Sequence, residues 1–231
     1  MRNVNISYSR GKLSLHRQLT QVFFWGDSFT AGENDYRRGG WAARVSAALM
    51  KRNHLQRQDV TMKSHWRTYP LGIGGETVDG LLRRFEGEFK SRELPNSRRL
   101  VCLQYGSNDV EWHKQKNRVP LPIFIRKYQQ ALTFFQAQGA EVFGLSIWPT
   151  ALALDGEPDI NGMVRHRADL ERYNDALKTL CEQNQGHWVN TCPFTFRKDP
   201  GSWLDADGVH PSSQGHAYIA LQILRSIRRL N

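Results

Sequence analysis

Short apolar runs alternate regularly with amphipathic segments along this chain. Five runs have the composition of buried strands, and each is followed by residues whose apolar positions recur at helical spacing. The predicted strands are 21–25, 66–71, 100–105, 141–148 and 187–190. Strands that alternate with helices form parallel sheets covered on both faces, with right-handed crossovers. The pattern therefore predicts a three-layer α/β/α sandwich around a five-stranded parallel sheet.

The first predicted strand ends in Gly26-Asp27-Ser28, a turn that presents a hydroxyl where the strand stops. Open α/β sheets bind their ligands at this carboxyl edge. A Gly-Asp-Ser tripeptide is by itself also typical of an ordinary turn with a serine cap. The other loops at the same edge decide between these interpretations.

Three later loops carry polar groups to the same predicted edge. A glycine turn at 72–75 follows the second strand, Asn108 follows the third, and the loop before the last helix contains Asp207 and His210. Because the carboxyl ends of parallel strands share one edge, we expect these residues to meet Ser28 in one crevice.

Nucleophilic acyl transfer needs an activated hydroxyl, a base, a group that orients the base, and donors for the oxyanion. Ser28 supplies the hydroxyl. Of the eight histidines, only His210 has an acidic residue three positions before it, and that residue is Asp207. One imidazole nitrogen can then bond the carboxylate while the other faces Ser28.

These motifs resemble those of the SGNH hydrolases, also called the GDSL esterase/lipase family. The four blocks of that family are matched in order over nearly the whole chain, from about residue 21 to the last helix. They are Gly26-Asp27-Ser28, the glycine turn, Gly106-Ser107-Asn108-Asp109 and Asp207-Gly208-Val209-His210. The resemblance implies a flavodoxin-like sheet with strand order 2-1-3-4-5 and no metal or organic cofactor.

The same resemblance implies a role for each matched residue. Ser28 is the expected nucleophile, His210 the general base and then acid, and Asp207 the orienting carboxylate. The expected oxyanion donors are the backbone amides of Ser28 and Gly75 and the side-chain amide of Asn108. Gly75 is preferred among the glycines because the family's glycine directly precedes an acid-Thr pair, matched here by 76–77.

The sequence thus predicts a serine esterase that hydrolyses carboxylic esters through an acyl-enzyme. Loops 29–40, 110–121 and 149–165 are expected to shape the pocket, and because they lack a long apolar segment we expect small or short acyl groups. A carbohydrate O-acetyl esterase, a lysophospholipase or thioesterase, and an acyltransferase remain alternatives on the same site. A Walker loop, an H-E-x-x-H motif and the G-x-S-x-G elbow are absent from the sequence.

Two hypotheses from other functional classes remain. One is a non-catalytic module that binds a small ligand in the same crevice. The other is a basic surface for nucleic acid or an anionic membrane, suggested by the net charge of +10. Because the basic residues, including the run 165–167, are scattered pairs typical of solvated helix faces, no nucleic-acid partner is expected. The expected partner is a small-molecule ester, and the sequence leaves the oligomeric state open.

The length of 231 residues favours one domain, predicted here as 21–231, preceded by a basic, loosely ordered arm at 1–20. The first twenty residues lack the apolar segment of a secretory signal, which favours a cytoplasmic location. No apolar run is long enough to cross a bilayer.

Three cysteines without C-x-x-C spacing suggest neither a zinc site nor a disulfide framework, and Cys102 is expected in the core. Glu111 and His113 lack the spacing of metal ligands and are expected to rim the pocket or lie on its surface.

Overall fold

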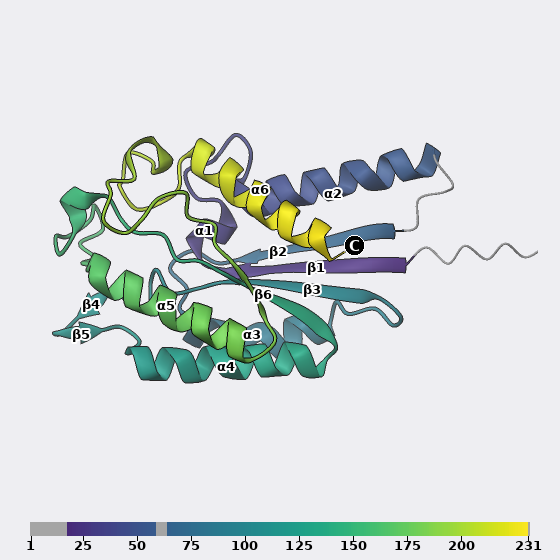
Figure 1. Ribbon diagram of the computed structural model, residues 1–231, viewed down its shortest axis with the longest axis horizontal. Coiled ribbons are helices and arrows are strands. Elements are labelled where there is room, and N and C mark those ends of the chain that lie inside the picture. The colour runs from purple at the N-terminus through teal and green to yellow at the C-terminus, as the bar shows by residue number, and fades with distance from the viewer. Residues whose placement is uncertain (1–17, 59–63, 231) are drawn as a thin grey trace, which may run out of the picture.

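A five-stranded parallel sheet forms the centre of the computed structural model, which describes residues 18–58 and 64–230 (Figure 1). Its strands are β1 (Gln18–Gly26), β2 (Ser64–Gly72), β3 (Arg98–Gln104), β6 (Ala140–Leu145) and β7 (His187–Val189). They lie in the order β2-β1-β3-β6-β7 and every pair is parallel. Since β6 and β7 are the fourth and fifth strands of this sheet along the chain, the predicted order 2-1-3-4-5 is confirmed.

Helices cover both faces of the sheet (Figure 1). One face carries α2 (Gly40–Gln58) and α6 (Ser213–Arg229), and the other carries α3 (Val78–Lys90), α4 (Leu121–Ala137) and α5 (Arg167–Gln183). The residues of β1 alternate between the two cores: Val22 and Phe24 pack with α2 and α6, and Phe23 and Trp25 with the other three helices. The three-layer α/β/α fold is therefore as predicted.

Some boundaries differ from the prediction. β1 begins three residues earlier than expected, and α2 continues through residues that the sequence pattern left unassigned. β6 stops at Leu145 although the apolar run continues to 148. The amide of Ser146 still donates to Val189 O, but the next amide, of Ile147, donates to Asn174 Oδ1 on α5. That side chain replaces the neighbouring strand as acceptor, and the ladder ends.

Short elements complete the carboxyl edge of the sheet. They are the one-turn helix α1 (Ser28–Ala31), the hairpin of β4 (Trp112–His113) and β5 (Lys116–Asn117), and the 3₁₀ turns η1 (Leu152–Leu154) and η2 (Gly201–Trp203). The sequence pattern predicted none of them, because two to four residues are too few to show a period.

The remaining expectations from composition fall partly on described residues. All three cysteines are buried and free, and Cys102 lies in the core as expected. Within the described ranges, no helix is both long and apolar enough to span a membrane. The predicted loose order of the arm at 1–20 lies outside the described residues, apart from 18–20, which belong to β1.

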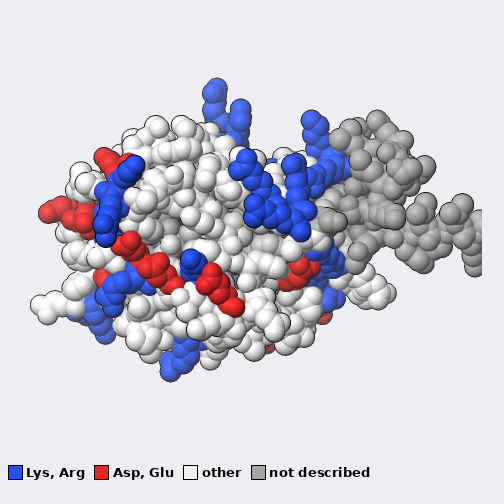
Figure 2. All heavy atoms as spheres, in the orientation of Figure 1, with Lys and Arg blue, Asp and Glu red and all other residues white. Residues whose placement is uncertain are grey.

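Basic side chains are spread over the surface in small groups, and several gather near the ends of α2 and α6 on the face drawn in Figure 2. The run 165–167 departs from the prediction of a solvated basic segment. Arg165 and Arg167 are buried, and both guanidinium groups bond acceptors inside the protein, as described for Arg165 below.

Candidate active site

Ser28 lies at the point where β1 ends and α1 begins. The carboxylate of Asp27 caps this helix, because its Oδ1 accepts a hydrogen bond from the Phe29 amide at 3.0 Å. Ser28 occupies the first helical position, where an amide has no intrahelical acceptor. Its side chain opens into a pocket although the residue is only 5% exposed. The turn therefore presents both the hydroxyl and the amide of Ser28 at the carboxyl edge of the sheet.

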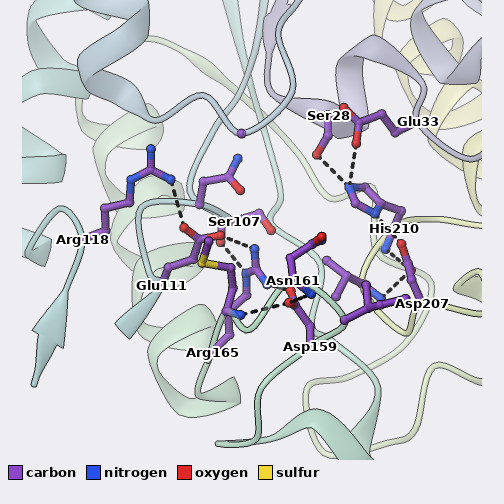
Figure 3. A pocket seen from close by; sticks show the side chains of 15 residues that line it. Ser28, Glu33, Ser107, Glu111, Arg118, Asp159, Asn161, Arg165, Asp207 and His210 are labelled. Atoms are coloured by element: carbon purple, nitrogen blue, oxygen red, sulfur yellow. Dashed lines mark hydrogen bonds and ion pairs between the residues drawn. The ribbon is translucent and has the colours of Figure 1, made fainter. Parts of the chain in front are cut away.

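The structure brings Ser28, His210 and Asp207 into one hydrogen-bonded chain (Figure 3). His210 Nε2 is 2.8 Å from Ser28 Oγ, and His210 Nδ1 is 2.6 Å from Asp207 Oδ2. Ser28 comes from the first strand, and the other two residues come from the loop that leads into α6. This is the juxtaposition that the sequence predicted, although the catalytic roles themselves stay predictions.

Asp207 is held by donors on both carboxylate oxygens. Its Oδ1 accepts hydrogen bonds from the amides of Val209 and His210, each at 2.9 Å. Its Oδ2 accepts from Asn34 Nδ2 at 2.8 Å, in addition to the imidazole. These four hydrogen bonds hold the carboxylate beside the His210 ring.

Two opposing effects act on the pKa values of this pair. Burial disfavours the charge of Asp207, but the hydrogen bonds from the His210 ring and from two backbone amides outweigh it, so the pKa of Asp207 is lowered. Burial also disfavours the imidazolium, yet the bond to Asp207 and the nearby charges of Asp207, Glu33 and Asp27 raise the pKa of His210. The site thus favours an ionised carboxylate beside a histidine that readily takes up a proton.

The other two predicted site residues line the same pocket. Gly75 follows β2 and has a positive φ of 70°, a conformation that favours glycine. Asn108 follows β3, and its Nδ2 donates to Glu76 O at 3.0 Å and more weakly to Asp27 Oδ2 at 3.3 Å. A substrate oxyanion would have to compete with Asp27 for the Asn108 amide.

Two buried carboxyl groups lie beneath these loops. Burial raises the pKa of Asp27 to about 7, although the Phe29 amide and the charges of His210 and Arg165 oppose this. Burial likewise raises the pKa of Asp109 to about 8, with the Val78 amide opposing and the charge of Asp27 contributing. In both groups burial thus favours the neutral acid over the carboxylate.

The pocket has a volume of about 190 Å³, and most of the residues that line it are polar or charged (Figure 3). Each of the loops 29–40, 110–121 and 149–165 contributes side chains to it, as the sequence predicted. Its apolar side chains are Ile160, Met163 and Val209. The space suits a small ligand with several hydrogen-bonding groups.

Arg165 organises the wall on the far side of the pocket from His210 (Figure 3). Its Nε donates to Ser107 O at 2.9 Å, its Nη1 bonds Asp159 Oδ2 at 2.7 Å, and its Nη2 bonds Glu111 Oε1. Arg118 Nη1 bonds the other oxygen of Glu111 at 2.9 Å. Every edge of the buried guanidinium therefore has an acceptor, and the network ties loop 149–165 to the segment that carries Asn108.

Sequence reasoning missed several of these residues. Glu33 and Asn34 sit in a polar loop without a motif, and Arg165 lies in what reads as a surface basic run. Glu111 does rim the pocket, one of the two placements expected for it, and His113 is exposed. Among the residues described, no group of histidine, cysteine and acidic side chains has the arrangement of a metal site.

Comparison with known proteins agrees with this fold. The model of the GDSL-like Lipase/Acylhydrolase family matches residues 24–218. The chain therefore belongs to this family of SGNH hydrolases, and it is a carboxylic ester hydrolase. It has no significant match among curated protein sequences.

Solved structures share the whole fold at low sequence identity. A catalytic mutant of Axe2, an acetylxylan esterase from Geobacillus stearothermophilus, aligns with a TM-score of 0.65 and 22% identity over 90% of this chain and 93% of that one. The acetyl xylan esterase AlAXEase aligns with a TM-score of 0.65 and 22% identity over 90% of this chain and 99% of that one. Three catalytic mutants of Axe2 replace a serine, a histidine and an aspartate, respectively.

Proposed function

We propose that this protein is a serine esterase that removes small acyl groups, acetyl above all, from polar alcohols such as sugars. The observation that carries the proposal is the chain from Asp207 through His210 to Ser28 at a small pocket lined mainly by polar and charged residues. The catalytic mutants of Axe2 support the assignment, because they change the same three residue types.

In the acylation step, Ser28 Oγ attacks the ester carbonyl carbon while its proton passes to His210 Nε2. Asp207 keeps the Nδ1 proton in place and stabilises the imidazolium. The carbonyl oxygen becomes an oxyanion, for which the Ser28 amide, the Gly75 amide and the Asn108 side chain are the donors. The oxyanion then collapses, the bond between the acyl carbon and the alcohol oxygen breaks, and His210 gives its Nε2 proton to that oxygen. The alcohol leaves, and the acyl group remains on Ser28.

Deacylation reverses these roles with water. His210 Nε2 takes a proton from a water molecule, whose oxygen attacks the acyl carbon. The second oxyanion collapses, the bond to Ser28 Oγ breaks, and His210 returns the proton to that oxygen. A carboxylic acid leaves, and the enzyme regains its starting protonation state.

The pocket favours short acyl groups on uncharged, polar alcohols. A volume of about 190 Å³ with three apolar side chains offers little surface for a long alkyl chain. Acidic and basic side chains both line it, among them Glu33, Asp159 and Arg165. The hydroxyl groups of an alcohol can hydrogen-bond to acidic and to basic side chains. A fatty acyl chain would instead remove water from these charged side chains without replacing its hydrogen bonds. The acetylxylan esterases with the same fold point to the same class.

Hydrolysis of p-nitrophenyl esters from acetate to octanoate by the native protein and Ser28→Ala tests the proposal. We expect the highest kcat/KM for acetate, and in the variant a fall of at least about 10³-fold without loss of folded structure. Acetylated xylooligosaccharides then test the alcohol side. A folded Ser28→Ala variant that keeps native activity would refute the serine mechanism, and a preference for octanoate would refute the substrate class.

The oxyanion role of Asn108 has its own test. Replacing it by alanine should lower kcat for p-nitrophenyl acetate by about 10²- to 10³-fold, the usual effect of losing one such donor. The KM should change little, because the donor acts mainly on the transition state. Unchanged turnover in Asn108→Ala would exclude this side chain from the oxyanion hole.

A further inference from the structure

Glu33 places a second carboxylate beside His210. It lies in the loop after α1, and its Oε2 is 3.5 Å from His210 Nε2, the same nitrogen that bonds Ser28 Oγ (Figure 3). Its side chain is 47% exposed and lines the pocket. The imidazole therefore has a carboxylate at each ring nitrogen, Asp207 at Nδ1 and Glu33 at Nε2.

The surrounding structure holds the backbone of Glu33 and leaves space for its carboxylate beside His210. Its amide donates to Ser28 O at 3.1 Å, which ties it to the nucleophile helix. Its carbonyl oxygen lies 3.4 Å from His216 Nε2 on α6. Its carboxylate rests against Gly74, where a Cβ atom would overlap Glu33 Oε1. A glycine at 74 thus provides the space that the Glu33 carboxylate occupies.

We propose that Glu33 is a positioning residue that acts through His210, stabilising the imidazolium formed when this histidine holds the proton of Ser28. The inference rests on the serine mechanism proposed above. In the resting enzyme the neutral His210 accepts from Ser28 Oγ. Once the proton has moved to Nε2, the Glu33 carboxylate faces a positive charge and attracts it. Departure of the proton to the leaving alcohol ends that attraction.

Other charges also act on His210, and their contributions must be separated from that of Glu33. The groups that face it are Asp207 in its own loop, Asp27 at the end of β1 and His216 on α6, with Arg165, Glu111 and Asp159 across the pocket. Glu33 is the most exposed of the carboxylates nearest the ring. Salt should therefore screen its effect more than theirs.

The sign of the effect follows from the charge. Activity requires neutral His210 in the free enzyme, so the acid limb of kcat/KM reports the pKa of that group. A nearby negative charge raises this pKa and moves the acid limb to higher pH. Replacing Glu33 by glutamine should move the acid limb to lower pH, while the plateau falls about two- to fivefold because the imidazolium is less stabilised.

The kinetic test compares three proteins on p-nitrophenyl acetate from pH 5 to 8: native, Glu33→Gln, and Glu157→Gln. The last removes one negative charge from an exposed residue of the opposite loop that does not line the pocket. We expect Glu33→Gln to lower the plateau and shift the acid limb, and Glu157→Gln to do neither. A merely structural role for Glu33 would lower activity at all pH values without moving the midpoint. Equal shifts in both variants would mean a general charge effect and would overturn the proposal.

Two further measurements locate the effect. In about 1 M salt, where screening acts over about 3 Å, the native acid limb should move toward that of Glu33→Gln. Gly74→Ala should displace the Glu33 carboxylate and shift the native profile in the same direction. The same glycine substitution should cause no further shift in a Glu33→Ala background. A shift of equal size in both backgrounds would show that Gly74 acts independently of Glu33.

A titration of His210 by nuclear magnetic resonance separates this proposal from the serine mechanism. The ring signals are followed in Ser28→Ala and in Ser28→Ala with Glu33→Gln, so that no turnover is needed. A lower midpoint in the double variant supports the role of Glu33, and identical midpoints overturn it whatever the ester assays show. If instead Ser28→Ala retains full esterase activity, the serine mechanism fails, and the positioning role of Glu33 in that mechanism fails with it.

Discussion

Two histidines, His210 and His216, contact the same residue of the loop after α1, and yet their pKa values are shifted in opposite directions. His210 faces the Glu33 carboxylate, and His216 lies beside the Glu33 carbonyl oxygen. The pKa of His210 is raised despite its burial, whereas burial lowers the pKa of His216 to about 4. The difference arises from their partners and from exposure: the His210 side chain is 14% exposed, and His216 is fully buried.

Hydrogen-bond partners explain why only one of them can serve as a base. His216 Nδ1 accepts the Trp41 amide at 3.3 Å, so a proton on that nitrogen would break a bond at the start of α2. His210 Nδ1 instead bonds a carboxylate, which favours the protonated ring. Burial near the pocket is thus not sufficient for base catalysis. A histidine also needs an anionic partner on one nitrogen and a reacting group on the other.

The largest expected effect comes from Asp207→Asn, which replaces the charged partner of His210 Nδ1 by a neutral one. In Asp207→Asn the oxygen can still accept the two backbone amides, but the new NH₂ group then faces His210 Nδ1. The imidazole must accept there and carry its proton on Nε2, so it cannot take the proton of Ser28. We expect kcat on p-nitrophenyl acetate to fall about 10⁴-fold, as for a triad with the wrong tautomer. A loss of less than tenfold in a folded variant would contradict the proposed role of Asp207.

The second largest expected effect is on the free energy of unfolding, and it arises from the titration of His216. Its folded pKa of about 4 lies below the ordinary 6.5, so the stability contributed by the neutral ring is present above pH 6.5 and is lost as pH falls toward 4. At 1.36 kcal/mol per pH unit this amounts to about 3 kcal/mol. Urea unfolding at pH 7 and pH 4 should show a smaller loss in His216→Asn, whose side-chain oxygen can still accept the Trp41 amide.

The exposed His113 provides the control for this experiment. His113→Asn should leave the difference in unfolding free energy between pH 7 and pH 4 at its native value. If His216→Asn also leaves that difference unchanged, other groups cause the acid sensitivity of the protein, and the contrast between the two histidines does not extend to stability.

The sequence predicted the part of the molecule that repeating patterns and motifs encode. Apolar runs with helical spacing between them predicted the parallel sheet and its three layers, and the resemblance to the family implied the strand order. The four blocks predicted the meeting of Ser28 with His210. It did not predict where β6 ends, because that depends on Asn174, a side chain from a helix packed against the next strand. Local pattern carries no information about such a contact.

Several of the charged residues that line the pocket were also not predicted, again because they contact segments far from them in the sequence. Arg165 reads as part of a solvated basic run, but the fold buries it among acceptors from its own loop and from the loop after β3. Glu33 and Asn34 likewise have no signature, since a polar residue in a polar loop is ordinary. Their contacts with His210 and Asp207 exist only because the loop after α1 returns to the edge where the last loop of the chain arrives.

The smallest expected effect concerns Asn34, a second donor to the Asp207 oxygen that faces His210. Asn34 Nδ2 shares Asp207 Oδ2 with His210, and its own φ is 67°, so glycine removes the side chain without straining the backbone. In Asn34→Gly the carboxylate loses one donor, which makes it less firmly held but a stronger acceptor for the imidazole. We expect kcat to fall about fivefold, the effect of losing one modest hydrogen bond, and the acid limb to move to higher pH. That shift is opposite to the one expected for Glu33→Gln.

Asn96→Gly, at a positive φ outside the pocket lining, is the control and should change neither quantity. If Asn34→Gly moved the acid limb to lower pH instead, Asp207 would depend on Asn34 for its orientation more than for its basicity.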